Sequence, residues 1–178
     1  MSSARLVIGY GNPLRADDGL GWVVAQRLRA VLDGDDCGGG VVVLAEHQLT
    51  PELAEPIARA QLVIFVDARA GDRPGRIDAR LVTPDRDHAP AFSHDVDPSA
   101  LVQMARHLYG GCPSAIVISV DGADFGYGAQ LSPIVEAAIP EVMRRIHGIL
   151  AGGGTRALGI LCGGFPRPHD SRGLSCTS

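Results

Sequence analysis

Several short stretches of the chain are continuously apolar and do not alternate with polar positions. They read RLVIGY, VVVLAEH, LVIFVDA and SAIVISV, and they begin at residues 5, 41, 62 and 114. Continuous apolar runs of this length are typical of parallel strands that are buried on both faces. The pattern therefore predicts a largely parallel sheet with helices packed against both of its sides.

Helical patterns follow most of these predicted strands. The first begins at the acidic pair in DDGLGWVVAQRLRAVL. Three later helices each begin with a polar residue followed directly by proline, at Thr50, Asp97 and Ser132. Proline is favoured at the first helical position, because its missing N–H would have no partner there. Pro140 lies inside the last helix and predicts a kink near Glu136.

One predicted strand breaks the alternation of strands and helices. It lies within residues 76–82, where RIDARLV alternates between polar and apolar positions, and only RAGDRPG separates it from the preceding strand. Parallel neighbours need a crossover of about a dozen residues or more. This fourth strand is therefore predicted to run antiparallel at a sheet edge. The predicted fold is a three-layer α/β/α sandwich with a five-stranded mixed sheet.

The length of 178 residues and the absence of internal repeats predict a single α/β domain over residues 1–150. Residues 151–178 are rich in Gly, Pro and Ser, and we interpret them as a C-terminal tail. The chain enters its first strand without a signal-peptide pattern, and no apolar run reaches the ~18 residues of a membrane span. These features predict a cytoplasmic protein with no membrane partner, and we separately expect it to be a monomer.

Charge and composition exclude several function classes. The net charge is −4, which does not favour binding to nucleic acid. All 16 basic residues are arginines, so a P-loop lysine, a Schiff base and a Ser–Lys dyad are excluded. What remains is a soluble enzyme or binding protein whose chemistry depends on other side chains.

The first strand leads into a glycine turn, GYGNPLRADDGLG, which superficially resembles a dinucleotide-binding loop. Leu14 occupies the position of the third glycine in that fingerprint. Asp17 and Asp18 stand at the helix N-terminus, where they would repel a pyrophosphate. We therefore predict that no dinucleotide binds here. Both aspartates could serve as helix caps, and Asp17 in particular is expected to act as a mild cap.

Chemistry-bearing residues follow three of the predicted strands. Asp18 follows the first, His47 ends the second and Asp67 ends the third. In open α/β sheets, ligands bind at the carboxyl ends of the strands. His94, in the long loop before the third helix, could approach the same rim. Two carboxylates and an imidazole suit a first-row divalent ion. The alternatives are that Asp67 only bonds the next loop and that His94 is a surface residue.

These motifs, taken together and in order, resemble the nickel–iron hydrogenase maturation protease family. The resemblance rests on GYGNPLRADDGLG, FVDA, the SH before a helix and GAQLSPIVEAAIPEV, from about residue 5 to residue 149. The stretch HQLTPELAEPIARAQLVIFVDA further resembles the branch that serves NAD-linked bidirectional hydrogenases. The resemblance implies an endopeptidase that removes the C-terminal extension of a hydrogenase large-subunit precursor after nickel insertion. It also implies the five-stranded mixed sheet predicted above.

The resemblance also implies roles for three residues. Asp18, Asp67 and His94 match the family's metal-contacting and catalytic positions. The metal would be nickel supplied by the precursor, or another divalent ion at the same site. Whether the metal activates water or a carboxylate acts as general base stays open. Two other functions fit the same residues: a nickel-sensing maturation chaperone that does not cleave, and a small-substrate metallohydrolase.

Overall fold

The computed structural model describes residues 5–32, 40–82, 96–111 and 113–152 of the chain. The loop that contains His94 and most of the predicted C-terminal tail lie outside these residues. The described elements are β1 (Arg5–Tyr10), η1 (Ala16–Gly19), α1 (Leu20–Leu32), β2 (Val41–Glu46), η3 (Pro51–Leu53), α2 (Ala54–Arg59), β3 (Leu62–Ala70), β4 (Ile77–Leu81), α3 (Pro98–Tyr109), β5 (Ser114–Gly122) and α4 (Pro133–Ala151).

The five strands form one mixed sheet in the order β2-β1-β3-β5-β4. The first four of these are parallel, and β4 runs antiparallel at the edge, as the short link predicts. The partner of β4 is β5, which comes later in the chain, with Ile77 opposite Val120. The link from β3 binds to the end of β5, because Gly75 N donates to Asp121 O at 2.7 Å.

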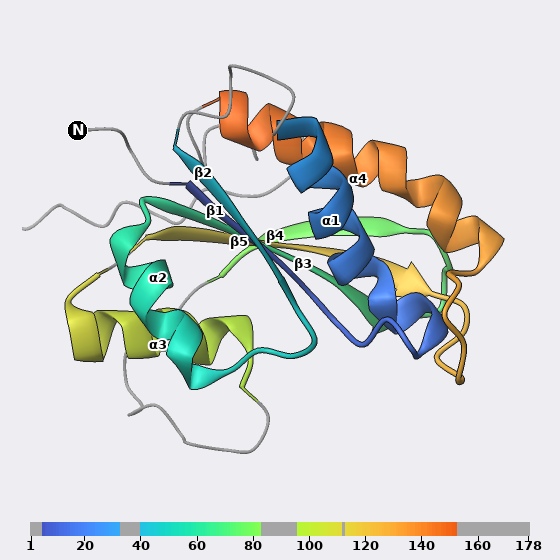
Figure 1. The fold of residues 1–178 in the computed structure, drawn as a ribbon, viewed down its shortest axis with the longest axis horizontal. Coiled ribbons are helices and arrows are strands. Elements are labelled where there is room, and N and C mark those ends of the chain that lie inside the picture. Colours follow the sequence, from blue (N-terminus) through green and yellow to red (C-terminus); the bar gives the residue numbers. More distant parts are fainter. Residues whose placement is uncertain (1–4, 33–39, 83–95, 112, 153–178) are drawn as a thin grey trace, which may run out of the picture.

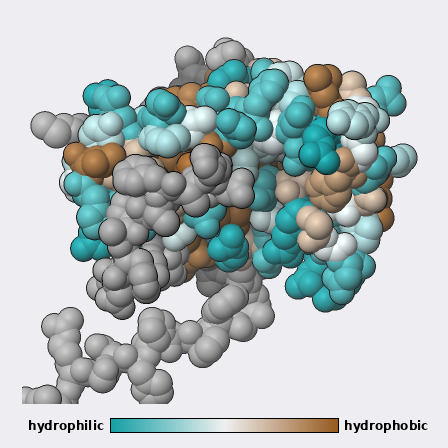
Figure 2. Space-filling view, turned by 90° about the horizontal axis from the view of Figure 1, so that it is seen from below, coloured by the Kyte–Doolittle hydropathy of each residue, from teal (hydrophilic) through white to brown (hydrophobic). Residues whose placement is uncertain are grey.

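Helices cover both faces of the sheet. In Figure 1, α1 and α4 lie on one side of the strands, and α2 and α3 lie on the other. Alternate residues of β3 supply the two cores: Leu62, Ile64 and Val66 pack on the α1–α4 side, and Val63 and Phe65 on the α2–α3 side. Figure 2 views the molecule from the α2–α3 side, where hydrophilic residues are interspersed with small apolar areas.

The third strand is longer than predicted. Asp67 does not end it, because residues up to Ala70 pair with β5, where Ala70 lies opposite Gly122. The pairing of β3 with β1, in contrast, stops at Val66. Asp67 is therefore the first residue of β3 beyond its ladder with β1. Polar residues from Asp67 onward hid this extension, since the prediction followed the apolar run.

The predicted helix starts are correct in position, but only one of the three polar residues before a proline makes a side-chain capping hydrogen bond. Asp97 caps α3, because its Oδ1 accepts a hydrogen bond from Ala100 N at 2.7 Å. Thr50 and Ser132 precede their helices without a side-chain capping bond. The last helix continues through Pro140 as one element, and the kink near Glu136 stays a prediction. None of the helices in the described residues is long and apolar enough to cross a bilayer.

Candidate active site at the carboxyl end of the sheet

Asp67 occupies the centre of the candidate site and has an unusual bonding pattern. Its Oδ2 accepts a hydrogen bond of 2.8 Å from the Oη of Tyr10, the last residue of β1. Its Oδ1 is buried and has no hydrogen-bond partner among the described residues. Buried polar atoms are nearly always bonded, so an exception needs an explanation. A proton or a cation would provide the missing partner.

The surroundings of Asp67 favour its uncharged form. Burial raises the pKa of the Asp67 carboxyl above its ordinary value, because the charged form loses hydration. The hydroxyls of Ser119 and Tyr10 and the charges of Arg80 and Arg69 oppose this shift without reversing it. A buried carboxyl with a raised pKa is typical of groups that exchange protons or bind cations.

Tyr10 holds this carboxyl as a permanent donor. Burial and the nearby charge of Asp67 both raise the pKa of the Tyr10 hydroxyl well above its ordinary value. The hydroxyl therefore keeps its proton throughout the physiological range and continues to donate to Oδ2. Tyr10 was not predicted from the sequence, although its place before Gly11 at the end of the first strand is a usable signal.

Asp18 lies in η1, directly after the turn that follows β1. It is half-buried, and its Oδ2 accepts a hydrogen bond of 2.9 Å from Asn12 N. The turn needs Gly11, whose φ is +134° and where a Cβ would lie 1.8 Å from the Asp18 carbonyl oxygen. Glycine at position 11 therefore allows the backbone of the turn to pack closely against the backbone of Asp18.

The structure places Asp18 and Asp67 at the carboxyl ends of adjacent parallel strands, β1 and β3. The start of α1 packs directly against both strand ends, because a Cβ on Gly21 would lie 2.2 Å from Val66 O and 2.4 Å from Tyr10 O. This contact places the start of α1, just after Asp18, against the ends of β1 and β3, which is the edge of the sheet where Asp67 lies. The two carboxylates predicted from the sequence therefore belong to the same end of the sheet.

Neither of the two histidines predicted near the carboxyl end of the sheet is placed in the candidate site by the described residues. His47 directly follows β2 and is exposed. His94 lies outside the described residues, so the three-residue site of Asp18, Asp67 and His94 stays a prediction. Within the described ranges, no group of three His, Cys, Asp or Glu side chains could hold a metal ion. A third ligand would have to come from outside those ranges or from a substrate.

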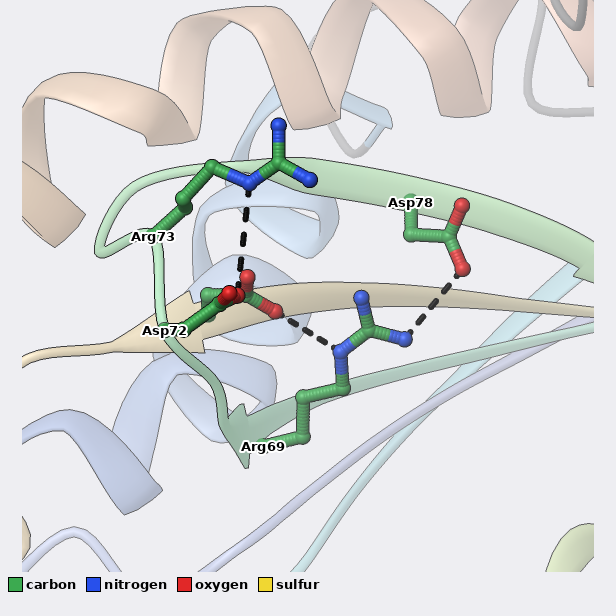
Figure 3. A network of polar contacts seen from close by, with 5 residues as sticks. Arg69, Asp72, Arg73 and Asp78 are labelled. Carbon is green, nitrogen blue, oxygen red and sulfur yellow. Dashed lines mark hydrogen bonds and ion pairs between the residues drawn. The ribbon is translucent and has the colours of Figure 1, made fainter.

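A polar network that was not predicted from the sequence lies two residues farther along β3. Arg69 Nε donates to Asp121 Oδ1 at 2.7 Å, and Arg69 Nη1 contacts Asp78 Oδ2 at 3.2 Å, which joins β3, β5 and β4 (Figure 3). Asp121 is buried, whereas the Arg69 and Asp78 side chains are about equally exposed. The SVDG sequence at the end of the last strand, which parallels FVDA, is a signal that could have identified Asp121.

Asp17 is the residue for which the sequence prediction is wrong. It was expected to be a mild helix cap, but η1 has no side-chain capping bond and Asp17 is fully buried. Its carboxylate instead accepts hydrogen bonds from Ala123, Asp124 and Ser132, in the loop between β5 and α4. Burial alone would raise its pKa, but these hydrogen bonds hold the pKa of Asp17 below its ordinary value.

Comparisons with known proteins identify the fold. No family model matches the chain, and no curated protein matches it. A nickel–iron hydrogenase maturation protease, HycI from Thermococcus kodakarensis, is similar in structure, with a TM-score of 0.66, 21% identity and 84% of this chain and 94% of that chain covered. The hydrogenase maturating endopeptidase HybD from Escherichia coli is also similar, with a TM-score of 0.61 and 22% identity. That match covers 84% of this chain and 94% of the HybD chain.

A third similar structure is a solution structure of an endopeptidase from Escherichia coli. It gives a TM-score of 0.64 and 22% identity, and the match covers 85% of this chain and 94% of that chain. The three matches therefore cover 84–85% of this chain and 94% of each solved chain. The chain has the α/β fold of the hydrogenase maturation proteases.

Proposed function

We propose that this protein is an endopeptidase of hydrogenase maturation, which removes the C-terminal extension of a nickel-loaded large-subunit precursor. The observation that carries the proposal is the buried Asp67 Oδ1, which has no hydrogen-bond partner among the described residues and lies at the rim where Asp18 also lies. The fold supports it, because similar solved structures are named hydrogenase maturation proteases. The motifs quoted from the sequence support the same family.

Nickel enters this proposal as part of the substrate. A divalent cation at the rim would bond to Asp67 Oδ1 and remove the unfavourable burial of an unpartnered oxygen. Carboxylate oxygens and an imidazole nitrogen are suitable ligands for first-row divalent ions. Asp18, Asp67 and His94 would therefore contact nickel that the precursor already holds, and nickel would serve as a recognition element.

The residues of the chain would perform the hydrolysis as acids, bases and orienting groups. Tyr10 holds Oδ2 of Asp67, so Oδ1, which no described residue bonds, is the oxygen that would accept a proton from water or contact the cation. The raised pKa of Asp67 brings this carboxyl closer to the range in which a general base or acid is effective. The cation, when bound, would polarise the scissile carbonyl.

The decisive experiment mixes the purified protein with nickel-loaded and with nickel-free precursor. Intact-mass measurement should show a shortened large subunit and a released C-terminal peptide only with the nickel-loaded precursor. Asp67→Asn should abolish this cleavage. Asp72→Asn is a matched control, because it makes the same chemical change at a side chain that is 89% exposed.

Each other outcome of this experiment contradicts a stated part of the proposal. Binding of the nickel-loaded precursor without cleavage would make the protein a maturation chaperone. Failure to bind or cleave the precursor would exclude both roles. Equal cleavage with and without nickel would remove nickel as the recognition element while leaving the endopeptidase activity.

A further inference from the structure

Asp17 and Asp18 are neighbours in sequence but lie in different environments. They belong to η1, a 3₁₀ segment in which successive side chains point about 120° apart. Asp17 is 0% exposed, whereas Asp18 is half-buried and its carboxylate accepts a hydrogen bond from Asn12 N in the turn beside it. The carboxylate of Asp17 is therefore buried, whereas the carboxylate of the next residue, Asp18, is partly exposed to solvent.

The Asp17 carboxylate fastens two distant segments together. Oδ2 accepts hydrogen bonds from Ala123 N at 2.7 Å, Asp124 N at 2.9 Å and Ser132 Oγ at 2.8 Å. Oδ1 accepts a further bond from Ser132 N at 2.7 Å. Charged acceptors make stronger and shorter hydrogen bonds than neutral ones. One side chain therefore attaches the turn that carries Asp18 to both ends of the β5–α4 loop.

Backbone bonds join the same two segments. Ala16 N donates to Gly128 O at 2.7 Å, Asp17 N donates to Asp124 O at 3.0 Å and Gly128 N donates to Leu14 O at 3.0 Å. Both main-chain hydrogen bonds and the hydrogen bonds of the Asp17 side chain therefore hold the turn against this loop. Its position depends on the β5–α4 loop rather than on α1 alone.

The turn is also strained. Ala16 has a φ of +45°, and it is the only described residue other than glycine with a positive φ. A left-handed backbone is unfavourable for a residue with a Cβ and persists only where the surroundings hold it. Ala16 directly precedes Asp17, so the bonds of Asp17 and of the Ala16 N–H are the restraints that maintain this conformation. Such strain is concentrated at functional sites.

We propose that Asp17 is a positioning residue for Asp18: it holds the strained Ala16 turn in place and thereby aims the Asp18 carboxylate at the reacting centre. The inference rests on the proposed function, because it assigns Asp18 a role in precursor cleavage. Loss of the Asp17 bonds would let Ala16 relax to a negative φ and shift Asp18. Contacts elsewhere with the precursor would be unchanged.

The test compares Asp17→Asn with the wild type on nickel-loaded precursor. Asparagine has nearly the same size as aspartate, but it carries no negative charge. Its NH2 group would also face the backbone N–H donors that the carboxylate accepts from. We expect kcat to fall by about 100-fold, because small displacements of a reacting group have effects of this size. KM should change by less than about threefold, since the loss falls on the chemical step and not on binding.

Two controls separate positioning from loss of stability. Ile57→Ala removes a buried side chain from α2, away from the candidate site, and every variant is measured at a temperature at which it is fully folded. Ile57→Ala should leave kcat near the wild-type value. Ser132→Ala removes one donor and keeps the backbone bond, so its decrease in kcat should be smaller than that of Asp17→Asn. This milder variant keeps the test decisive if Asp17→Asn does not fold.

A rescue experiment addresses the strain itself. Glycine adopts positive φ without strain, so Ala16→Gly in the Asp17→Asn background should restore part of kcat. Crystal structures should show Ala16 at negative φ and a broken Asn12 N–Asp18 Oδ2 bond in Asp17→Asn, with that bond recovered in the double variant. This structural result does not depend on the identity of the substrate.

The outcomes distinguish the inference from the proposed function. If the wild type does not cleave any precursor, the proposed function fails whatever Asp17 does. If the wild type cleaves and both Asp17→Asn and Ser132→Ala retain its kcat, Asp17 is only structural and the inference is wrong. A decrease in kcat that Ile57→Ala reproduces would also overturn it.

Discussion

Tyr10 donates a hydrogen bond of 2.8 Å to Asp67 Oδ2 across β1 and β3, and Oδ1 of the same carboxylate has no hydrogen-bond partner in the part of the chain that the structure describes. The bond joins the last residue of β1 to the first residue of β3 beyond their shared ladder. The candidate site is therefore built where the main-chain pairing of these strands stops and side-chain pairing replaces it.

Tyr10→Phe tests the contribution of this bond. Without the hydroxyl, Asp67 Oδ2 loses its 2.8 Å donor, and the free energy of unfolding should fall by about 1–3 kcal/mol at neutral pH. The loss should shrink at acidic pH, where a proton on Asp67 provides the missing polar partner. Chemical denaturation at several pH values measures this. Tyr109→Phe, at an exposed tyrosine, is the control and should change nothing.

Asp67→Asn should leave the protein at least as stable as the wild type at neutral pH. Because the folded-state pKa of Asp67 is raised, the wild type is destabilised as pH rises from the ordinary carboxyl range through the raised pKa. Asparagine does not titrate, so the melting temperatures of the wild type and of Asp67→Asn should be similar at acidic pH. They should diverge as the pH rises through the raised pKa of Asp67. Circular-dichroism melts measure this difference. A variant that is less stable at every pH would show that the charged form is favourable in the fold.

Asp17 should have the opposite pH dependence. Its folded-state pKa is lowered, so its stabilising effect is complete above the ordinary carboxyl pKa and is lost as pH falls through the lowered one. Asp17→Asn should reduce the free energy of unfolding by about 2–4 kcal/mol at neutral pH, because buried donors lose a charged acceptor. The deficit should narrow in strong acid. Asp72→Asn should show neither effect.

The network around Arg69 should be sensitive to which partner is removed. Arg69→Gln leaves Asp121 as a buried carboxylate without its cation, which should cost about 3–5 kcal/mol of stability. Asp78→Asn removes a more exposed partner and should cost at most about 1 kcal/mol. Urea denaturation of the two variants compares these values. Similar losses would mean that the burial of Asp121 is not decisive.

His94→Ala tests the predicted third ligand. The variant should strongly slow cleavage of nickel-loaded precursor, because a divalent ion would lose its nitrogen ligand. The thermal midpoint should stay nearly unchanged. His147→Ala, at an exposed residue of α4, is the matched control and should cleave normally. Full activity of His94→Ala would remove this histidine from the site.

The sequence by itself determined the architecture. Continuous apolar runs are characteristic of strands buried on both faces, and the short link after β3 excluded a parallel β4. The positions of Asp18 after β1 and of Asp67 after an apolar run were enough to place both at the carboxyl end of the sheet. These inferences succeed because periodicity, chain length and strand direction are local properties.

Only the tertiary structure decided what each aspartate does. Asp17 looked like a cap because local rules consider only the next few residues, whereas its partners Ala123 and Ser132 lie more than a hundred residues away. The bond from Tyr10 to Asp67 Oδ2, and the lack of a partner for Oδ1 within the described ranges, likewise depend on which strands are neighbours. Burial and hydrogen bonding of a charged group depend on the segments that fold around it, and the identity of the residue does not specify those segments.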